Sequence, residues 1–339
     1  MVETRPVSVS SAQGEEYVRC TLCGADDAAL LYNIPVKDYN RGRYARDSWP
    51  VVRCRSCGLI YCNPRIDAEA RAAHYQFTNP GEQAFIQDWF IDNADIQQAQ
   101  WQRILRVIQC YCPHGQLLDL GCGPGHFLAE ARALGYEAIG QDISPVFRQI
   151  AADKHKISVY ETLADVAAQH GRNFACATAF DVIEHHADPA QMVRDMRAML
   201  RPGGLLVITT HDIGNWFAQR YGPNWRYLNP IGHLTYFTRD TLGALLLKHG
   251  FRIERWGGWH TIEARPPAEI TRWATQSLRT LGLRGLLMYG YKPLAERFPA
   301  LSRWELRLGR ATLNHRKMMT RVGEQVIIND DMVAIARAV

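Results

Sequence analysis

The sequence predicts an α/β fold with a doubly wound parallel sheet, preceded by a small metal-binding module. Three observations predict it: an apolar strand that turns into a helix through alternating glycines at 117–128, alternating strand-like and helix-like segments from there to residue 210, and two C-x-x-C pairs near the N-terminus. With 339 residues, 47% hydrophobic and 22% charged, the chain can bury a sizeable core in two or three domains.

The N-terminal segment contains two C-x-x-C-G motifs, at 20–24 and 54–58. Each motif brings two thiolates to one side of a tight turn, and together they supply four soft ligands for tetrahedral zinc. We therefore expect a structural zinc ribbon over residues 1–75, with a redox dithiol or unpaired core cysteines as the alternatives. Cys62 is expected to be a small buried side chain rather than a ligand. The predicted zinc ligands are Cys20, Cys23, Cys54 and Cys57.

Residues 76–112 follow the ribbon, and apolar and aromatic residues recur at helical spacing over 83–110. Packing against the core is the ordinary explanation for this pattern. The functional alternative is a helical lid or linker that excludes water from a reaction. The sequence leaves both open.

The glycine segment has the spacing D-x-G-x-G-x-G from Asp119 to Gly125. Glycines at a strand-to-helix turn let the backbone approach a ligand, which predicts a nucleotide-like cofactor. A dinucleotide site would show G-x-G-x-x-G, so this spacing favours S-adenosylmethionine over NAD. The segment closely resembles class I S-adenosylmethionine-dependent methyltransferases, and the resemblance extends with interruptions to Arg337. It implies a Rossmann-like seven-stranded sheet over 113–339. It also implies cofactor contacts from Asp119, Gly121, Cys122, Gly123 and Gly125.

The second and third strands are expected at 136–141 and 157–160. The second ends at Asp142, an acidic residue suitably placed to bind ribose hydroxyls, and Ile143 follows it. In the resembled family the residues after the third strand, here 161–163 with Thr162 at their centre, flank the adenine.

A fourth strand, 174–180, leads into a D-V-x-E-H-x-x-D-P segment at 181–189 that is similar to small-molecule methyltransferases. Phe180 and Asp181 then lie beside the amino-acid end of the cofactor, which Asp119 orients. A helix over 191–200 is expected to end at Arg201-Pro202-Gly203-Gly204, before an apolar fifth strand at 205–210.

Methyl transfer needs a nucleophile in line with the sulfonium, and the protein can add a base for the acceptor's proton. Histidine titrates near neutrality and suits this role. Each candidate also has a structural alternative, such as capping a helix or holding two loops together. The candidate bases are His185, His186, His211 and His233, with Glu184 as a carboxylate alternative.

The stretch 265–321 separates a sixth strand, opening at Phe251, from a closing strand at 331–337 that the resembled fold places antiparallel. It carries twelve Arg or Lys against three Glu, interleaved with apolar residues as in an amphipathic helical surface. We expect a helical insert that is solvated or self-associating, for instance in a homodimer. Peripheral contact with a membrane or lipid acceptor, and recognition of an anionic acceptor, are the alternatives.

The ribbon is similar to the N-terminal zinc module of sugar C-methyltransferases, where it covers the acceptor pocket. We therefore expect O- or C-methylation of a small molecule from secondary, sugar, lipid or quinone-like metabolism. The alternatives are an RNA base methyltransferase, disfavoured because there is no N-P-P-Y motif, and a cofactor-binding scaffold without activity. The sequence shows neither a membrane span nor a secretory signal, so the expected location is cytoplasmic.

Overall fold

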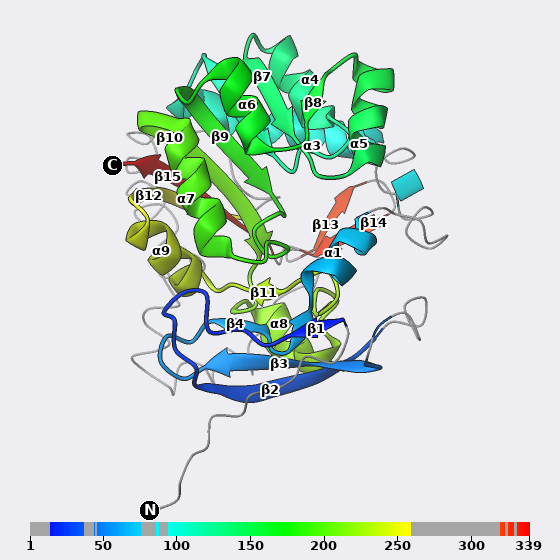
Figure 1. Ribbon diagram of the computed structural model, residues 1–339. Coiled ribbons are helices and arrows are strands. Elements are labelled where there is room, and N and C mark those ends of the chain that lie inside the picture. The colour runs from blue at the N-terminus through cyan, green and yellow to red at the C-terminus, as the bar shows by residue number, and fades with distance from the viewer. Residues whose placement is uncertain are drawn as a thin grey trace, which may run out of the picture.

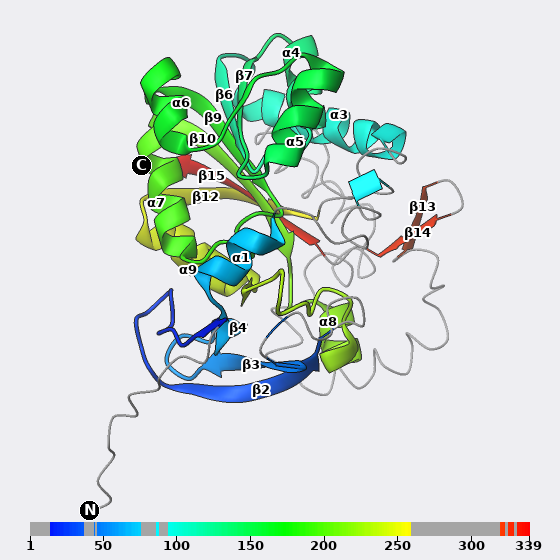
Figure 2. The ribbon, with the colours of Figure 1, turned by 45° about the vertical axis from the view of Figure 1, so that its right-hand side comes forward.

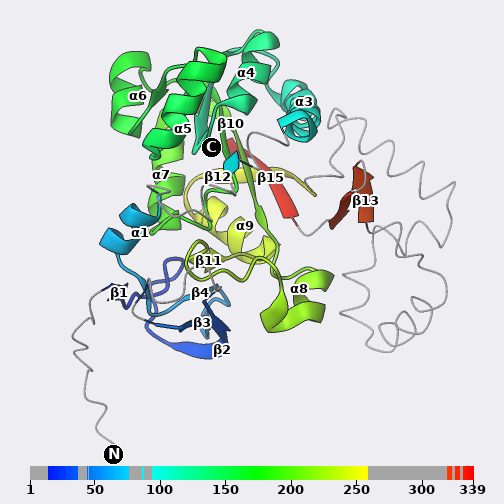
Figure 3. The same ribbon diagram turned by 90° about the vertical axis from the view of Figure 1, so that its right-hand side faces the viewer.

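The computed structural model describes residues 14–36, 44, 46–75, 86–87, 94–258, 319–322, 325–328 and 331–339 (Figure 1). Two sheets dominate this part of the chain. The larger belongs to the glycine-rich half, and the smaller N-terminal sheet lies at its far end in all three ribbon views (Figures 1, 2 and 3). The doubly wound α/β fold expected from the sequence is confirmed.

Seven strands of the described chain form the larger sheet, in the order β12-β15-β10-β9-β6-β7-β8. The pairs from β10 to β8 are parallel, whereas β15 is antiparallel to both of its neighbours. The antiparallel closing strand is therefore confirmed. The strands are β6 (Gln116–Leu120), β7 (Glu137–Gln141), β8 (Val159–Tyr160), β9 (Phe174–Phe180), β10 (Leu200–His211), β12 (Phe251–Gly257) and β15 (Asp331–Ala338).

Apolar helix faces cover both sides of this sheet. One side buries α6, α7 and α9, and the other buries α3 and α4, as two separate clusters of side chains with almost no exposure. Helix starts are well capped: Asp188, for example, accepts hydrogen bonds from the first amides of α7. The helices are α3 (Ala94–Tyr111), α4 (His126–Ala133), α5 (Pro145–Ile150), η3 (Ala151–His155), α6 (Leu163–His170), α7 (Pro189–Met199) and α9 (Arg239–Lys248).

The N-terminal sheet has the order β11-β4-β3-β2 and includes a strand from the glycine-rich half. In β11, Thr235 and Tyr236 pair antiparallel with Tyr61 and Ile60 of β4. The two halves thus share a sheet as well as a core. The elements are β2 (Ala28–Pro35), β3 (Ser48–Cys54), β4 (Ile60–Cys62) and β11 (Thr235–Tyr236), with β1 (Glu15–Glu16) paired to β5 (Arg65–Ile66), then α1 (Ala68–His74), α8 (Trp216–Tyr221) and η4 (Gly222–Asn224).

Two sequence-based boundaries differ from the structure. Strand β10 begins at Leu200 rather than at residue 205, because the Pro-Gly-Gly stretch forms an irregularity within the strand. The end of the predicted helical insert forms a β-strand instead of a helix: β13 (Met319–Val322) pairs with β14 (Gln325–Ile328). Residues 265–318, most of the insert, and residues 76–85 of the expected lid lie outside the described residues.

Cys62 is fully buried, as expected, and its Sγ lies 3.4 Å from the His233 carbonyl. Among the described helices, none is both long and apolar enough to cross a membrane.

Candidate functional site

Two positions of the turn between β6 and α4 require glycine. Gly121 has φ +65°, a value that other residues rarely adopt, and a Cβ there would lie 2.6 Å from Cγ2 of Val182. Gly125, with φ +82°, begins α4 from a left-handed conformation. The backbone therefore passes closer to the mouth of β9 than any other residue type would allow.

Asp142 holds this turn in place from the end of β7. Its Oδ2 accepts the amide of Gly123 and its Oδ1 accepts the amide of Ser144, both at 2.8 Å. Each carboxylate oxygen keeps a second lone pair, so both oxygens can still accept a ribose hydroxyl. Burial raises the pKa of Asp142, and the two amide hydrogen bonds oppose that shift.

The turn's amides are largely used within the protein. The amide of Cys122 donates to Gln141, and that of Gly125 donates to Cys122. The glycines therefore allow close approach of the backbone, while these two amides fix the turn. Ile143 is exposed beside it, and Thr162 caps α6 through hydrogen bonds with Asp165.

Asp119 lies at the end of β6 with only 2% of its surface exposed, and its Oδ1 accepts the Thr178 hydroxyl at 2.6 Å. Burial raises the pKa of Asp119 to about 8, and the Asp142 carboxylate adds to the shift. A neighbouring cation, such as the ammonium of an amino acid, would favour the charged form. The site is thus prepared for a positive ligand.

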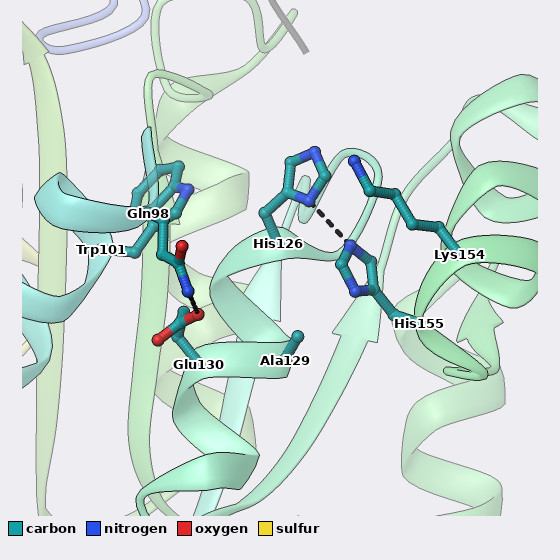
Figure 4. Close-up of a pocket in the computed structure, with 7 residues that line it drawn as sticks. All are labelled: Gln98, Trp101, His126, Ala129, Glu130, Lys154 and His155. Atoms are coloured by element: carbon teal, nitrogen blue, oxygen red, sulfur yellow. Dashed lines mark hydrogen bonds between the residues drawn. The ribbon is translucent and has the colours of Figure 1, made fainter. Parts of the chain in front are cut away.

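Aromatic rings form the opposite wall of the turn. Phe180, at the end of β9, packs against Phe127 and Trp101 with ring centroids 4.8 and 5.3 Å away. Behind them lies a pocket of about 190 Å³ between α3, α4 and η3, in which Nδ1 of His126 lies 2.7 Å from Nε2 of His155 (Figure 4). All of its lining residues come from helices rather than strand ends, and it is smaller than typical ligand sites of about 300–1,000 Å³.

A buried carboxylate–imidazole cluster stands at the carboxyl ends of β9 and β10. It joins Glu184, His211 and His233, whose potential ligand atoms all lie within 4.8 Å of one another. His211 is the last residue of β10, and its Nε2 lies 3.6 Å from Oε1 of Glu184. Three of the five candidate bases are thus brought together.

The other two candidate bases use Nδ1 to bind the backbone, and the ring of His185 also contacts that of His233, with centroids 4.7 Å apart. Nδ1 of His185 lies 2.8 Å from the Gly232 carbonyl and must donate to it, and burial lowers the pKa of His185 to about 4. Nδ1 of His186 accepts the amide of Asp188, near the start of α7. Both histidines hold backbone segments in place.

Two residues of the cluster were missed from the sequence. Asp331 begins β15, and its Oδ1 lies 2.6 Å from Nδ1 of His211. The signal was available, because an antiparallel closing strand places its first residue beside the last residue of β10. Tyr227 stacks on the His211 ring with centroids 3.4 Å apart, and its loop gave no pattern that predicts this.

Charges within the cluster compensate one another. Burial disfavours the His211 imidazolium, but the hydrogen bond to Asp331 and the charges of Asp181, Glu184 and Asp331 together outweigh burial and raise the pKa of His211 to about 9. Burial raises the pKa of Glu184 to about 8, with the Asp181 charge adding to the shift. Asp181 itself is held by Thr209, through its amide and its Oδ1.

The four predicted zinc ligands come together in the N-terminal module. Sγ of Cys20 lies 3.4 Å from that of Cys57, and Sγ of Cys23 lies 3.5 Å from that of Cys54. Four sulfurs bound tetrahedrally at about 2.3 Å from one ion lie at similar separations, so the residues fit zinc. Burial opposes ionisation of Cys54, yet nearby amides and the Cys23 thiol lower its pKa to about 7.

Comparison with known proteins identifies a family match over most of the larger sheet. A family model described as "Methyltransferase domain" matches residues 103–255. Residues 103–255 are a methyltransferase domain. They carry the glycine turn, Asp142 and most of the carboxylate–imidazole cluster, and the domain is of the S-adenosylmethionine-dependent class I type.

Curated relatives match over part of this domain. A ubiquinone biosynthesis O-methyltransferase from Cereibacter sphaeroides is 34% identical over 100 residues, which are 28% of this chain and 40% of the relative. One from Xanthomonas campestris is 31% identical over 105 residues, 29% of this chain and 44% of the relative. The chain spans about two fifths of the length of these relatives.

The chain also aligns with solved structures, at TM-scores below 0.5. A SAM-dependent methyltransferase from Archaeoglobus fulgidus aligns with a TM-score of 0.45 at 15% identity, over 75% of this chain and 98% of that one. A possible histamine N-methyltransferase from Thermotoga maritima aligns with a TM-score of 0.40 at 19% identity, over 55% and 82%.

Proposed function

We propose that the protein transfers a methyl group from S-adenosylmethionine to an oxygen of a small-molecule acceptor. The observation that carries this proposal is the placement of the buried cluster of Glu184, His211 and His233 on the same sheet edge as the glycine turn and Asp142. Ligands of open α/β sheets bind at this edge. The O-methyltransferases among the relatives support oxygen as the acceptor atom.

Asp142 would hold the ribose, Asp119 would face the amino-acid end, and Phe180 would close the apolar side. Bound there, S-adenosylmethionine supplies an electrophilic methyl group. Glu184 and His211 would take up the acceptor's proton, and their perturbed pKa values are typical of proton-transfer groups.

The N-terminal module would hold structural zinc and form the floor of the acceptor site. Support comes from β11, whose neighbouring amides at Leu234 and Thr235 both donate to the Glu184 carbonyl while the strand pairs with β4. Four protein ligands leave no open position on a zinc ion, so this metal would stabilise the module without catalysing.

The test is incubation of the full chain with S-adenosylmethionine carrying a deuterated methyl group. The acceptor panel contains a catechol (3,4-dihydroxybenzoate), a nucleotide-linked deoxysugar and total RNA, with products analysed by mass spectrometry. Label on an oxygen of a small molecule supports the proposal. Label on RNA alone, on a sugar carbon alone, or tight cofactor binding without any transfer contradicts it.

A further inference from the structure

We propose that Glu184, His211 and His233 bind a divalent first-row transition metal ion, separate from the N-terminal thiol site. The ion would hold and acidify the acceptor hydroxyl. The metal site rests on the geometry of these residues alone, whereas the role of the ion also rests on the proposed function.

Both imidazoles are oriented by an acceptor on the same ring nitrogen. Nδ1 of His211 faces the Asp331 carboxylate at 2.6 Å, and Nδ1 of His233 faces the Tyr227 carbonyl at 2.8 Å. A carbonyl can only accept, so Nδ1 of His233 carries the proton and Nε2 is left with a lone pair. When Nδ1 of His211 donates to Asp331, its Nε2 is likewise a ligand atom. Metal-binding histidines are held by carboxylates and backbone carbonyls in this way.

The third ligand is a buried carboxylate that lies 3.6 Å from the His211 ring without a direct hydrogen bond. Glu184 is 2% exposed, and neither of its oxygens has a hydrogen-bond partner among the described residues. Leaving a buried carboxylate without partners is costly, so such a group calls for an explanation.

The donor set indicates the class of ion. Two imidazoles and one carboxylate suit zinc, iron, manganese or cobalt and leave coordination positions open for water or an acceptor oxygen. Ligand bonds of about 2.1 Å require donor atoms about 3–4 Å apart. Glu184 and His211 already meet this at 3.6 Å, and all three donors lie within 4.8 Å.

An ion here would perform the deprotonation otherwise assigned to a general base. It lowers the pKa of a hydroxyl that approaches it, and the proton leaves to solvent. The oxygen's electron pair then forms the new bond to the methyl carbon, while the electrons of the broken carbon–sulfur bond stay on sulfur. No oxidant or reductant is needed.

The test is a metal count on the full chain after loading with cobalt(II) and removal of excess ion. We expect two ions per chain in the unsubstituted protein. We expect one in Glu184→Gln and one in His233→Gln, with the sulfur-to-cobalt absorption of the N-terminal site unchanged in both. That absorption also reports that the variants are folded. His170→Asn is the matched control, because this histidine binds Tyr160 on another edge of the sheet, and it should keep two ions.

A single cobalt ion in the unsubstituted protein overturns the inference, as does a second ion that survives in both variants. Two ions together with no transfer to any acceptor leave the site standing and contradict the proposed function. Full transfer by protein that retains only the thiol-bound ion keeps the proposed function and contradicts the role of the second ion.

Discussion

The thiol cluster of the N-terminal module and the carboxylate–imidazole cluster at the ends of β9 and β10 use ligating groups in opposite ways. Four cysteines, with Sγ pairs 3.4 and 3.5 Å apart, surround one point completely. Glu184, His211 and His233 supply only three donors and depend on Asp331 and Tyr227 for their orientation. The comparison teaches that a closed donor set stabilises a fold, whereas an incomplete one next to a cofactor site leaves room for chemistry.

The largest expected effect is at the closed cluster. Cys54→Ser should abolish zinc binding and cost several kcal/mol of folding free energy, because binding energy at a structural zinc site is folding energy. Zinc content and thermal unfolding measure it. Cys110→Ser, the same change in α3, is the control and should retain zinc. Equal unfolding temperatures for Cys54→Ser and Cys110→Ser would show that the thiol cluster does not stabilise the fold, and the contrast with the carboxylate–imidazole cluster would be wrong.

Substitution of Asp142, at the carboxyl end of β7, should change the affinity for S-adenosylmethionine rather than the metal content. Asp142→Ala should weaken S-adenosylmethionine binding by about 1–3 kcal/mol, since it removes charge-assisted hydrogen bonds to ribose and the tie to Gly123. Calorimetric titration measures the affinity, and zinc content should not change. An unaltered dissociation constant would refute the assignment of Asp142.

Asp331→Asn tests the incomplete donor set more gently. It keeps the size of the side chain but weakens the orientation of His211, so we expect a 10- to 100-fold loss of activity. The unfolding temperature and the affinity for S-adenosylmethionine should stay close to those of the unsubstituted protein. A loss of stability without loss of turnover would show that Asp331 serves the fold only.

The smallest effect concerns protons at Asp119, whose folded-state pKa of about 8 exceeds the ordinary value of 3.8. Between these two pH values the folded protein binds a proton that the unfolded chain releases, so this contribution to stability declines as pH rises from about 4 to 8. Docking of the cofactor's ammonium should favour the charged carboxylate and release up to one proton at pH 7. Calorimetry in buffers of different ionisation enthalpy detects it, and Asp119→Asn should release none.

Much of the fold could be predicted from sequence because its signals are local. The turn from 119 to 125 needs glycine for steric reasons, and each cysteine motif closes within five residues. The site could be predicted only in part. His211 and Glu184 were candidates because they lie at or beyond the ends of predicted strands, but the sequence did not predict that they meet. Asp331 lies 120 residues from His211, and its role comes from antiparallel pairing across the insert.

Two features could not be predicted from the sequence, and each has a physical reason. The start of β10 was missed because its Pro-Gly-Gly stretch has the composition of a turn, yet Leu200 pairs with Phe174 before the irregularity. His185 matched a family pattern, but only the fold shows that Gly232 occupies its Nδ1. Pattern gives the residue type, and packing decides which way it faces.

The two-residue strand β11 has a practical consequence for anyone designing shorter versions of this protein. Its pairing with β4 places the N-terminal sheet next to the backbone around Glu184. A fragment that starts at residue 103 would lack β4, which pairs with Thr235 and Tyr236. The amides of Leu234 and Thr235, which donate to the Glu184 carbonyl, would then become exposed to water. The boundary of the family match is therefore a poor site for truncation, because the N-terminal module supports the structure of the methyltransferase domain.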